Sequence, residues 1–261
     1  MDMEATGART VARRVKWARV HAALGDPTRL AVVDVVHHDD VSPQELARRL
    51  GIAPNLLSHH VRVLEAAGIV RRVVSEGDRR RTYVQAVPGA LDGLWSMDAT
   101  ASDPNRTGAV EPRTWLVPRG LFVCTRNSAR SVLAAALWSR ASSVPVASAG
   151  TEPAREVHPM ALRAARRQGL MLTFEARDEA PSLGRPRHVK DVARPRDLVV
   201  STCDAAREAM VGGAPSSIHW SVADPVRIGT ESAFDAAVRE LRWRVERLAA
   251  VVAAEPRGVT G

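Results

Sequence analysis

Cysteine is scarce in this sequence of 261 residues, which contains only Cys124 and Cys203. Two cysteines are too few for the disulfide framework that stabilises small secreted proteins. In a cytosolic chain, isolated cysteines are either inert residues of the core or reactive thiols. The count alone leaves both interpretations open.

Long apolar runs are also missing. No stretch approaches the roughly 18 apolar residues of a membrane-spanning helix, so we expect no membrane partner. The sequence begins MDMEATGART, which has no apolar core and carries acidic side chains. We therefore expect no secretory signal and predict a cytoplasmic protein.

Lysine is nearly absent, occurring only at Lys16 and Lys190, although the formal net charge is +8. The positive charge is therefore carried mostly by arginine, whose planar guanidinium suits phosphate binding. A GC-rich genome that favours arginine codons explains the excess equally well. Charge alone does not establish nucleic-acid binding.

The chain length favours two domains. Residues 97–117 are rich in Ser, Thr, Asp, Gly and Pro and show no sustained apolar period, which indicates a linker. A helix-rich half precedes this stretch, and alternating strands and helices follow it. We expect a first domain over residues 1–96, a second over residues 118–255, and a tail over residues 256–261.

Helix boundary signals are clear in the first half. Asp26 and Pro27 suit the N-cap and the first position of a helix. Ser42 suits the N-cap of a second helix, and Glu45 stands where a capping box needs it. Gly51 is placed to end that second helix.

A third helix begins a few residues later, near Pro54, and ends at Gly68. Leu57, Val61 and Leu64 recur at helical spacing and are expected to face the core. Two helices joined by so short a turn predict a helix-turn-helix, whose second helix can lie in the major groove of DNA.

A basic hairpin follows. Two β-type runs, roughly residues 69–75 and 81–87, flank a Glu-Gly-Asp turn. A hairpin at this place is typical of a wing. The guanidinium groups of Arg79, Arg80 and Arg81 can pair there with DNA phosphates.

The stretches GDPTRL, LARRLGIAPNLLSHHVRVLEAAGIV and EGDRRRTYV resemble the ArsR-type winged-helix repressors over roughly residues 15–95. The resemblance implies a mainly α winged helix-turn-helix fold and a homodimer that binds a double-stranded DNA operator. The residues expected to face DNA are Asn55, Leu56, Ser58, His59, Arg62, Arg79, Arg80 and Arg81.

We expect no metal site in this domain. Many ArsR-type relatives carry a cysteine pair before the turn, but the corresponding stretch DDVSPQELA has none. His37, His38, Asp39 and Asp40 are of ligand type. Adjacent residues at a helix end point in different directions, which favours a solvated helix terminus. Of the neighbouring pair at 59 and 60, we expect one histidine on the DNA face and one in the core.

The stretch FVCTRNSARS, residues 122–131, predicts an oxyanion-binding loop. A short buried strand ends at Cys124, and a helical pattern begins near Arg130. A tight loop between them directs backbone N–H groups and the positive end of a helix dipole into one concavity. Such a nest stabilises Cys124 as a thiolate nucleophile, and Arg130 is placed to clamp a tetrahedral oxyanion.

Two side chains of this loop suit the task. Asn127 tolerates unusual backbone angles, and Ser131 can donate a hydrogen bond to the sulfur of Cys124. The predicted oxyanion-binding residues are Thr125, Arg126, Asn127, Ser128, Ala129, Arg130 and Ser131.

Residues 118–255 resemble the low-molecular-weight protein tyrosine phosphatase superfamily, and more closely its arsenate reductase branch. The loop, ASAGTEPAREVHPMALRAARRQGL, DLVVSTCDAARE and IHWSVADPV carry the resemblance. It implies an α/β domain with a four-stranded parallel sheet. It also implies that Cys124 is the nucleophile, Arg130 the oxyanion clamp, and Asp224 the acid beside the leaving oxygen.

Phosphate and arsenate are close in shape and charge, so the loop does not decide between them. Arsenate reduction needs a second thiol to attack the cysteine adduct. Cys203 lies where thioredoxin-linked relatives carry their next redox cysteine, but Met210 replaces the third cysteine of their relay. Either Cys203 resolves the adduct, or an external thiol such as glutathione or mycothiol does. A buried structural Cys203 is the alternative.

We therefore predict an ArsR-type transcriptional regulator fused to a thiol-dependent arsenate reductase, an oxidoreductase of arsenic resistance. No bound cofactor is expected, only a reductant such as glutathione, mycothiol or the thioredoxin system. The predicted catalytic residues are Cys124, Arg130, Asp224 and Cys203. Two alternatives remain for the second domain: a non-catalytic oxyanion sensor that controls DNA affinity, or a protein tyrosine phosphatase.

Overall fold

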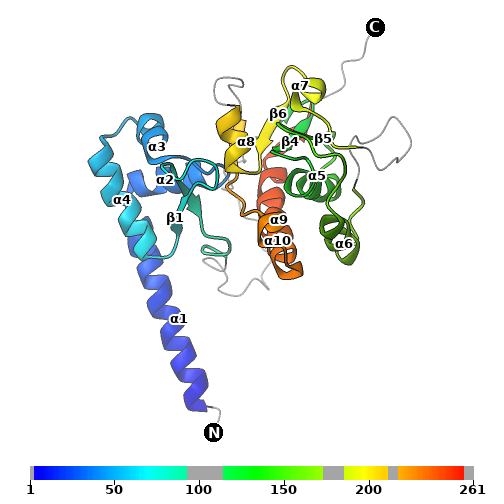
Figure 1. Ribbon diagram of the computed structural model, residues 1–261. Coiled ribbons are helices and arrows are strands. Elements are labelled where there is room, and N and C mark those ends of the chain that lie inside the picture. The colour runs from blue at the N-terminus through cyan, green and yellow to red at the C-terminus, as the bar shows by residue number, and fades with distance from the viewer. Residues whose placement is uncertain (1–2, 93–113, 173–184, 211–216, 256–261) are drawn as a thin grey trace. The chain divides into compact units, whose positions relative to one another are not determined.

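The computed structural model of the protein divides the chain into two compact units (Figure 1). The first comprises Met1–Val74 and Arg81–Val110, and the second comprises Ser75–Arg80 and Glu111–Gly261. Side chains in the first helix are described from residue 14 on. The described residues are 3–92, 114–172, 185–210 and 217–255.

The first unit contains four helices and a hairpin among its described residues. The helices begin where the capping signals predict: the Asp26 carboxylate accepts a hydrogen bond from the Arg29 amide at 2.9 Å, and the Ser42 hydroxyl accepts one from the Glu45 amide at 3.3 Å. Gly51, with φ of 65°, ends the second capped helix as expected. The elements are α1 (Met3–Leu24), α2 (Pro27–Val36), α3 (Pro43–Leu50), α4 (Pro54–Ala66), β1 (Val70–Val74) and β2 (Thr82–Ala86).

The apolar stripe of α4 packs into the core of this unit. Leu57, Val61 and Leu64 are at most 1% exposed, which confirms their predicted core positions. His60 is buried while His59 is exposed, as expected for the pair. α3 and α4 are joined by three residues, and this short turn fixes the helix-turn-helix.

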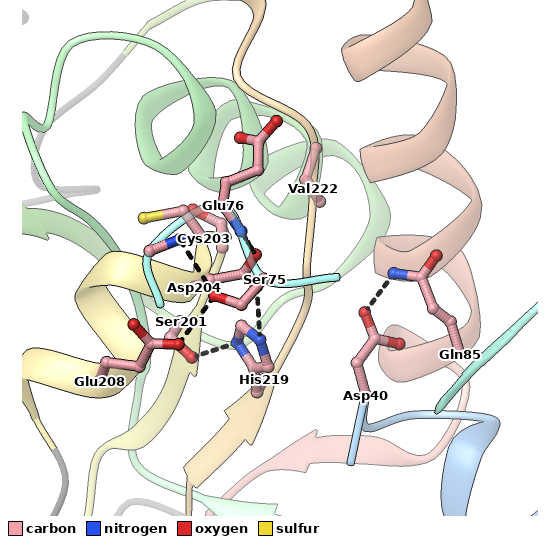
Figure 2. Close-up of polar contacts among 12 residues, drawn as sticks. Asp40, Ser75, Glu76, Gln85, Ser201, Cys203, Asp204, Glu208, His219 and Val222 are labelled. Atoms are coloured by element: carbon pink, nitrogen blue, oxygen red, sulfur yellow. Dashed lines mark hydrogen bonds and ion pairs between the residues drawn. The ribbon is translucent and has the colours of Figure 1, made fainter. Parts of the chain in front are cut away.

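The hairpin pairs β1 with β2 in an antiparallel register from Val70 opposite Ala86 to Val74 opposite Thr82. Behind it, the solvated helix end expected at residues 37–40 is wrong for the two aspartates. Asp40 is 2% exposed and accepts a hydrogen bond from the amide of Gln85 at 2.7 Å (Figure 2), and Asp39 pairs with Arg49 at 2.7 Å. Buried carboxylates need such partners.

The second unit is built on a four-stranded parallel sheet of order β5-β4-β6-β7, which confirms the predicted α/β architecture. The sheet strands are β4 (Gly120–Cys124), β5 (Val146–Gly150), β6 (Leu198–Ser201) and β7 (Ser217–His219). The central strand β4 is buried along its whole length, as expected for a parallel strand covered on both faces.

Helices cover both faces of this sheet (Figure 1). α5 and α10 pack together against one face, where the apolar stripe from Phe234 to Leu248 of α10 is buried as predicted. α8 lies against the other face, beside Leu121 and Val123. The helices of the unit are α5 (Arg130–Ala141), α6 (Pro159–Arg167), α7 (Val189–Val192), α8 (Asp204–Ala209), α9 (Pro225–Ile228) and α10 (Glu231–Ala249).

A small second sheet was not expected. β3 (Trp115–Val117) pairs in parallel with β8 (Val252–Ala254), so the last residues of the range expected to be a linker join the second unit. The remainder of that linker, to residue 113, and the tail 256–261 lie outside the described residues. None of the helices in the described part of the chain combines the length and apolar character that a membrane crossing requires.

The cap of α3 gives a first prediction. Ser42→Ala removes the side chain that accepts from the Glu45 amide, so we expect the free energy of unfolding of the first unit to fall by about 1 kcal/mol. Ser58→Ala is the matched control, because its exposed hydroxyl only donates back to the Pro54 carbonyl. Urea titration followed by circular dichroism measures both, and equal stabilities for the two variants would contradict the prediction.

Candidate functional site

The loop after β4 lies at the carboxyl edge of the parallel sheet, where α/β proteins commonly bind ligands. Cys124 is the last residue of β4 and stands opposite Gly150 in the register with β5. Arg130 is the first residue of α5. The strand, the loop and the helix therefore follow one another as the sequence predicts.

Carbonyl oxygens of the loop are turned outward. Those of Cys124, Thr125, Arg126 and Ser128 accept hydrogen bonds from the amides of residues 151, 152, 154 and 158, at 2.8–3.1 Å. In a trans peptide the N–H points opposite to the C=O. Fixing the carbonyls on one side therefore directs the N–H groups of the next residues to the inner side, which is what an anion nest requires.

Asn127 holds the shape of this loop from within. Its φ is 48°, in the left-handed region that asparagine tolerates. Its amide nitrogen donates to the hydroxyls of Ser131 and Ser148, both at 3.0 Å, and its oxygen accepts from the Arg187 amide at 3.0 Å. Ser131 lies 3.1 Å from the sulfur of Cys124, so the predicted hydroxyl–sulfur contact is present.

The Arg130 side chain is about 10% exposed. It donates to the Val222 carbonyl at 3.0 Å and pairs with the Asp224 carboxylate at 3.1 Å. Burial works to lower the pKa of Arg130, but the ionised forms of Cys203 and Cys124 and the carboxylate of Asp224 outweigh it and raise the pKa. The structure thus places the other three predicted catalytic residues, Cys124, Asp224 and Cys203, close to the guanidinium of Arg130.

Cys203 precedes α8 and is 2% exposed. Its sulfur lies 3.4 Å from the hydroxyl of Thr125, the first loop residue after Cys124. Burial raises the pKa of the Cys203 thiol, the guanidinium of Arg130 lowers it, and Cys124 raises it again. Because the net direction is upward, Cys203 is a protonated thiol at neutral pH.

The other predicted loop residues differ in their exposure. Asn127, Ser128, Ala129 and Ser131 are buried. Arg126 is exposed and lies 4.0 Å from Glu152, so its side chain points away from the concavity that the backbone lines.

A buried polar chain behind Cys203 was missed from the sequence. His219 lies 2.9 Å from the hydroxyl of Ser201 and 3.0 Å from the carboxylate of Asp204, and all three side chains are at most 3% exposed (Figure 2). Asp204 follows Cys203 directly, so this chain fixes the start of α8. In the sequence, the stretch IHWS shows only that polar and apolar residues alternate around His219. This pattern does not identify Ser201 or Asp204 as its partners.

The predicted DNA-facing residues of the first unit lie at the surface. On α4, the side chains on the face opposite the buried stripe are exposed, and so are the arginines of the hairpin turn. Arg80 pairs with Asp78 at 2.9 Å. Arg79 and Arg80 fall in the segment Ser75–Arg80, which groups with the second unit. The exposed residues are Asn55, Leu56, Ser58, His59, Arg62, Arg79, Arg80 and Arg81.

Within the described ranges, no group of three or more His, Cys, Asp or Glu side chains is arranged to hold a metal ion. Of the ligand-type residues considered at the end of α2, Asp39 and Asp40 are engaged by Arg49 and Gln85.

Comparison with known families finds two matches. The family model of a helix-turn-helix domain matches residues 24–73. The family model described as low molecular weight phosphotyrosine protein phosphatase matches residues 119–257. No curated protein matches the chain in sequence.

Solved structures resemble about half of this chain. An arsenate reductase from Archaeoglobus fulgidus is 26% identical, with 49% of this chain and 97% of that chain covered and a TM-score of 0.39. The YwlE arginine phosphatase from Geobacillus stearothermophilus is 26% identical over 50% and 90% of the two chains, with a TM-score of 0.41. The tyrosine phosphatase Wzb from Escherichia coli K30, in complex with sulphate, is 22% identical over 51% and 97%, with a TM-score of 0.42.

Gly150 gives a prediction for the loop. A Cβ added there would lie 2.7 Å from the Thr125 carbonyl oxygen and 2.9 Å from the Asn127 amide nitrogen, so Gly150→Ala must displace the loop backbone. We expect a loss of about tenfold or more in affinity for inorganic phosphate, since a nest depends on aligned N–H groups.

The matched control is Gly120→Ala at the first residue of β4, far from the loop that follows this strand. There the added Cβ meets only Trp138 and Phe122 at 3.7–3.9 Å. Isothermal calorimetry measures phosphate affinity, and circular dichroism checks that both variants are folded. Unchanged phosphate affinity in folded Gly150→Ala would show that the nest is not the binding site.

Proposed function

The chain belongs to the low molecular weight phosphotyrosine protein phosphatase family, and from this premise we propose that it is an ArsR-type transcriptional regulator fused to a thiol-dependent arsenate reductase. Cys124 is the nucleophile, Arg130 the oxyanion clamp and Asp224 the proton donor. A linker that begins near residue 97 and ends before β3, the homodimer and the cytoplasmic location belong to the same proposal.

The placement of the second cysteine carries the choice of arsenate. The chain has two cysteines, and both lie at the oxyanion loop: Cys124 at its base, and Cys203 with its sulfur 3.4 Å from the Thr125 hydroxyl. Hydrolysis of a phosphate ester needs one thiol. Reduction of arsenate needs two electrons, which two thiols supply when they become a disulfide.

The reaction balances as follows. The thiolate of Cys124 attacks As(V), and one arsenate oxygen leaves as water after it takes protons, with Asp224 as the donor near that oxygen. A second thiol then attacks the sulfur of Cys124 and loses its proton. A disulfide forms, the As–S bond breaks, and its electron pair stays on arsenic, which leaves as arsenite, As(III).

Cys203 is the second thiol in this proposal. Because its pKa is raised by burial, it stays protonated while arsenate binds, and no second negative charge opposes the oxyanion. It must lose its proton when it attacks the sulfur of Cys124. An external reductant, either a small thiol such as glutathione or mycothiol or the thioredoxin system, then restores both thiols.

The first unit supplies the DNA-binding half of the proposal. The exposed face of α4 carries Asn55, His59 and Arg62, which can reach base edges and phosphates when the helix lies in the major groove. The arginines of the hairpin turn add contacts to the phosphate backbone.

A paired assay tests the enzymatic half. Cys124→Ser is expected to abolish both arsenate reduction and hydrolysis of an aryl phosphate, since both need the nucleophile. Cys203→Ser is expected to lower arsenate reduction about a hundredfold or more while hydrolysis stays within about threefold, because only reduction uses the second thiol. Arsenite production and phosphate release are measured with glutathione or thioredoxin as the reductant.

Three results would change the assignment. Equal arsenate turnover in Cys203→Ser and wild type would give the resolving role to the external thiol. Hydrolysis much faster than arsenate turnover in the wild type would favour the tyrosine phosphatase alternative. Phosphate binding with neither activity would favour the oxyanion sensor.

The DNA-binding half gives a separate prediction. Arg62→Ala is expected to weaken binding to double-stranded DNA and to reduce the slope of log affinity against log salt by about one, because one phosphate contact is lost. Arg72→Ala is the matched control, since that arginine is paired with Glu65 at 2.7 Å. Fluorescence anisotropy with a random-sequence duplex at several salt concentrations measures both, and identical slopes for the two variants would argue against α4 as the DNA-facing helix.

A further inference from the structure

The segment Ser75–Arg80 belongs to the second compact unit, although in the sequence it directly follows β1 of the first unit. Ser75 is 2% exposed, and its hydroxyl donates to Glu208 at 2.8 Å. The Glu76 amide donates to the Asp204 carboxylate at 2.7 Å (Figure 2). At Gly77 an added Cβ would lie 3.0 Å from the backbone of Ala205, so the segment contacts the start of α8 closely.

The anchor on Asp204 is rigid. This carboxylate is buried and also bonded to His219, which in turn contacts Ser201. Burial works to raise the pKa of Asp204, but the hydrogen bonds from His219, the Glu76 amide and Ser221, together with the charge of His219, outweigh it and lower the pKa. Asp204 is therefore a charged acceptor with a fixed position, and charge-assisted bonds of this kind are stronger than neutral ones.

The side chain of Glu76 reaches the catalytic constellation. One carboxylate oxygen accepts from the Asp224 amide at 3.0 Å and lies 3.8 Å from the guanidinium of Arg130. The other oxygen pairs with Arg227 at 2.5 Å. Glu76 is thus an anion in contact with the residue that is assigned to clamp the oxyanion and next to the residue assigned as the proton donor.

An oxyanion bound to Arg130 would be repelled by the negatively charged carboxylate of Glu76. Phosphate and arsenate carry up to two negative charges near neutral pH. Like charges a few ångströms apart repel each other, although the Glu76 side chain is 28% exposed and solvent therefore screens part of this repulsion. Arg130 is nearly buried and already contacts the carboxylates of Asp224 and Glu76. Each of these carboxylates partly neutralises the guanidinium and so weakens its attraction for a bound oxyanion.

We propose that Glu76 is a tethered competitor of the oxyanion: seated, it weakens phosphate and arsenate binding at Arg130, and a bound oxyanion displaces it and loosens the segment Ser75–Arg80. This rests on the proposed oxyanion site of Cys124 and Arg130 and adds its regulation. The apparent affinity for the oxyanion is then the intrinsic affinity reduced by the fraction of molecules in which Glu76 is unseated.

The test is phosphate binding by isothermal calorimetry in the full chain carrying Cys124→Ser, which removes turnover. Glu76→Gln keeps the size of the side chain and removes its charge, and we expect phosphate to bind about threefold or more tightly than in the parent. Glu152→Gln is the matched control: the same charge is lost at the rim of the loop, but Glu152 faces Arg126 and not Arg130. Its expected change is less than about twofold.

A third variant separates competition from simple charge removal. Ser75→Ala alters no charge but removes the hydroxyl that bonds Glu208 and accepts from the Gly77 and Asp78 amides. It weakens the seat of Glu76, so tethered competition predicts tighter phosphate binding here too. Unchanged affinity in both Ser75→Ala and Glu76→Gln would overturn the competition and leave the proposed oxyanion site intact. Absence of phosphate binding in every variant would instead refute the oxyanion site itself, and the competition with it.

Hydrogen exchange gives an independent readout in the same protein. The Glu76 amide is bonded to Asp204, so it is protected while the segment is seated. Saturating phosphate is expected to speed exchange in residues 75–80 by about fivefold or more. In Glu76→Gln, exchange is expected to be faster already without phosphate, and phosphate should not speed it further. Equal protection with and without phosphate, in a chain that binds phosphate, would contradict displacement.

Discussion

The buried guanidinium of Arg130 is the charge on which the second unit's site depends. A cation taken out of water is costly unless it is paired and hydrogen-bonded. The Val222 carbonyl, Asp224 and Glu76 supply those partners from segments far apart in the sequence. One side chain therefore connects the first turn of α5 with the loop before α9 and with the segment after β1. Its raised pKa also keeps it charged beside the loop that follows Cys124.

Those parts of the fold that rest on local chemistry could be predicted from the sequence. Asp26 and Ser42 cap helices because their oxygens are within reach of amides three residues later. Asn127 and Ser131 could be assigned because the loop between a buried strand and a helix leaves few conformations, and the left-handed φ of Asn127 is one of them. The same holds for the core stripe of α4, which follows from helical spacing alone.

Long-range polar partners could not be predicted, because no periodicity records them. Ser148, which accepts from Asn127, lies in a small-residue strand and carried no sign of its role. The sequence predicted a solvated helix end at Asp40, yet this side chain is buried and bonded to Gln85, 45 residues later. Glu76 looked like an ordinary turn residue of a hairpin. Its partners Asp224 and Arg227 lie about 150 residues further on, and only the folded chain brings them together.

The short segment Ser75–Arg80 contains residues for which two different roles are proposed. Its Glu76 contacts Arg130, which is proposed to clamp an oxyanion, and three and four residues later stand Arg79 and Arg80, which are proposed to bind DNA phosphates. Both proposed roles concern tetrahedral phosphate-like anions, and they use charge in opposite ways: the carboxylate of Glu76 would compete with the anion, whereas the two arginines would bind it. Because the chain between them is so short, a conformation that seats Glu76 on Arg130 restricts the conformations open to both arginines. Any ligand that binds one of these conformations better than the other must shift the balance between them, and the coupling between the two ligands is then reciprocal.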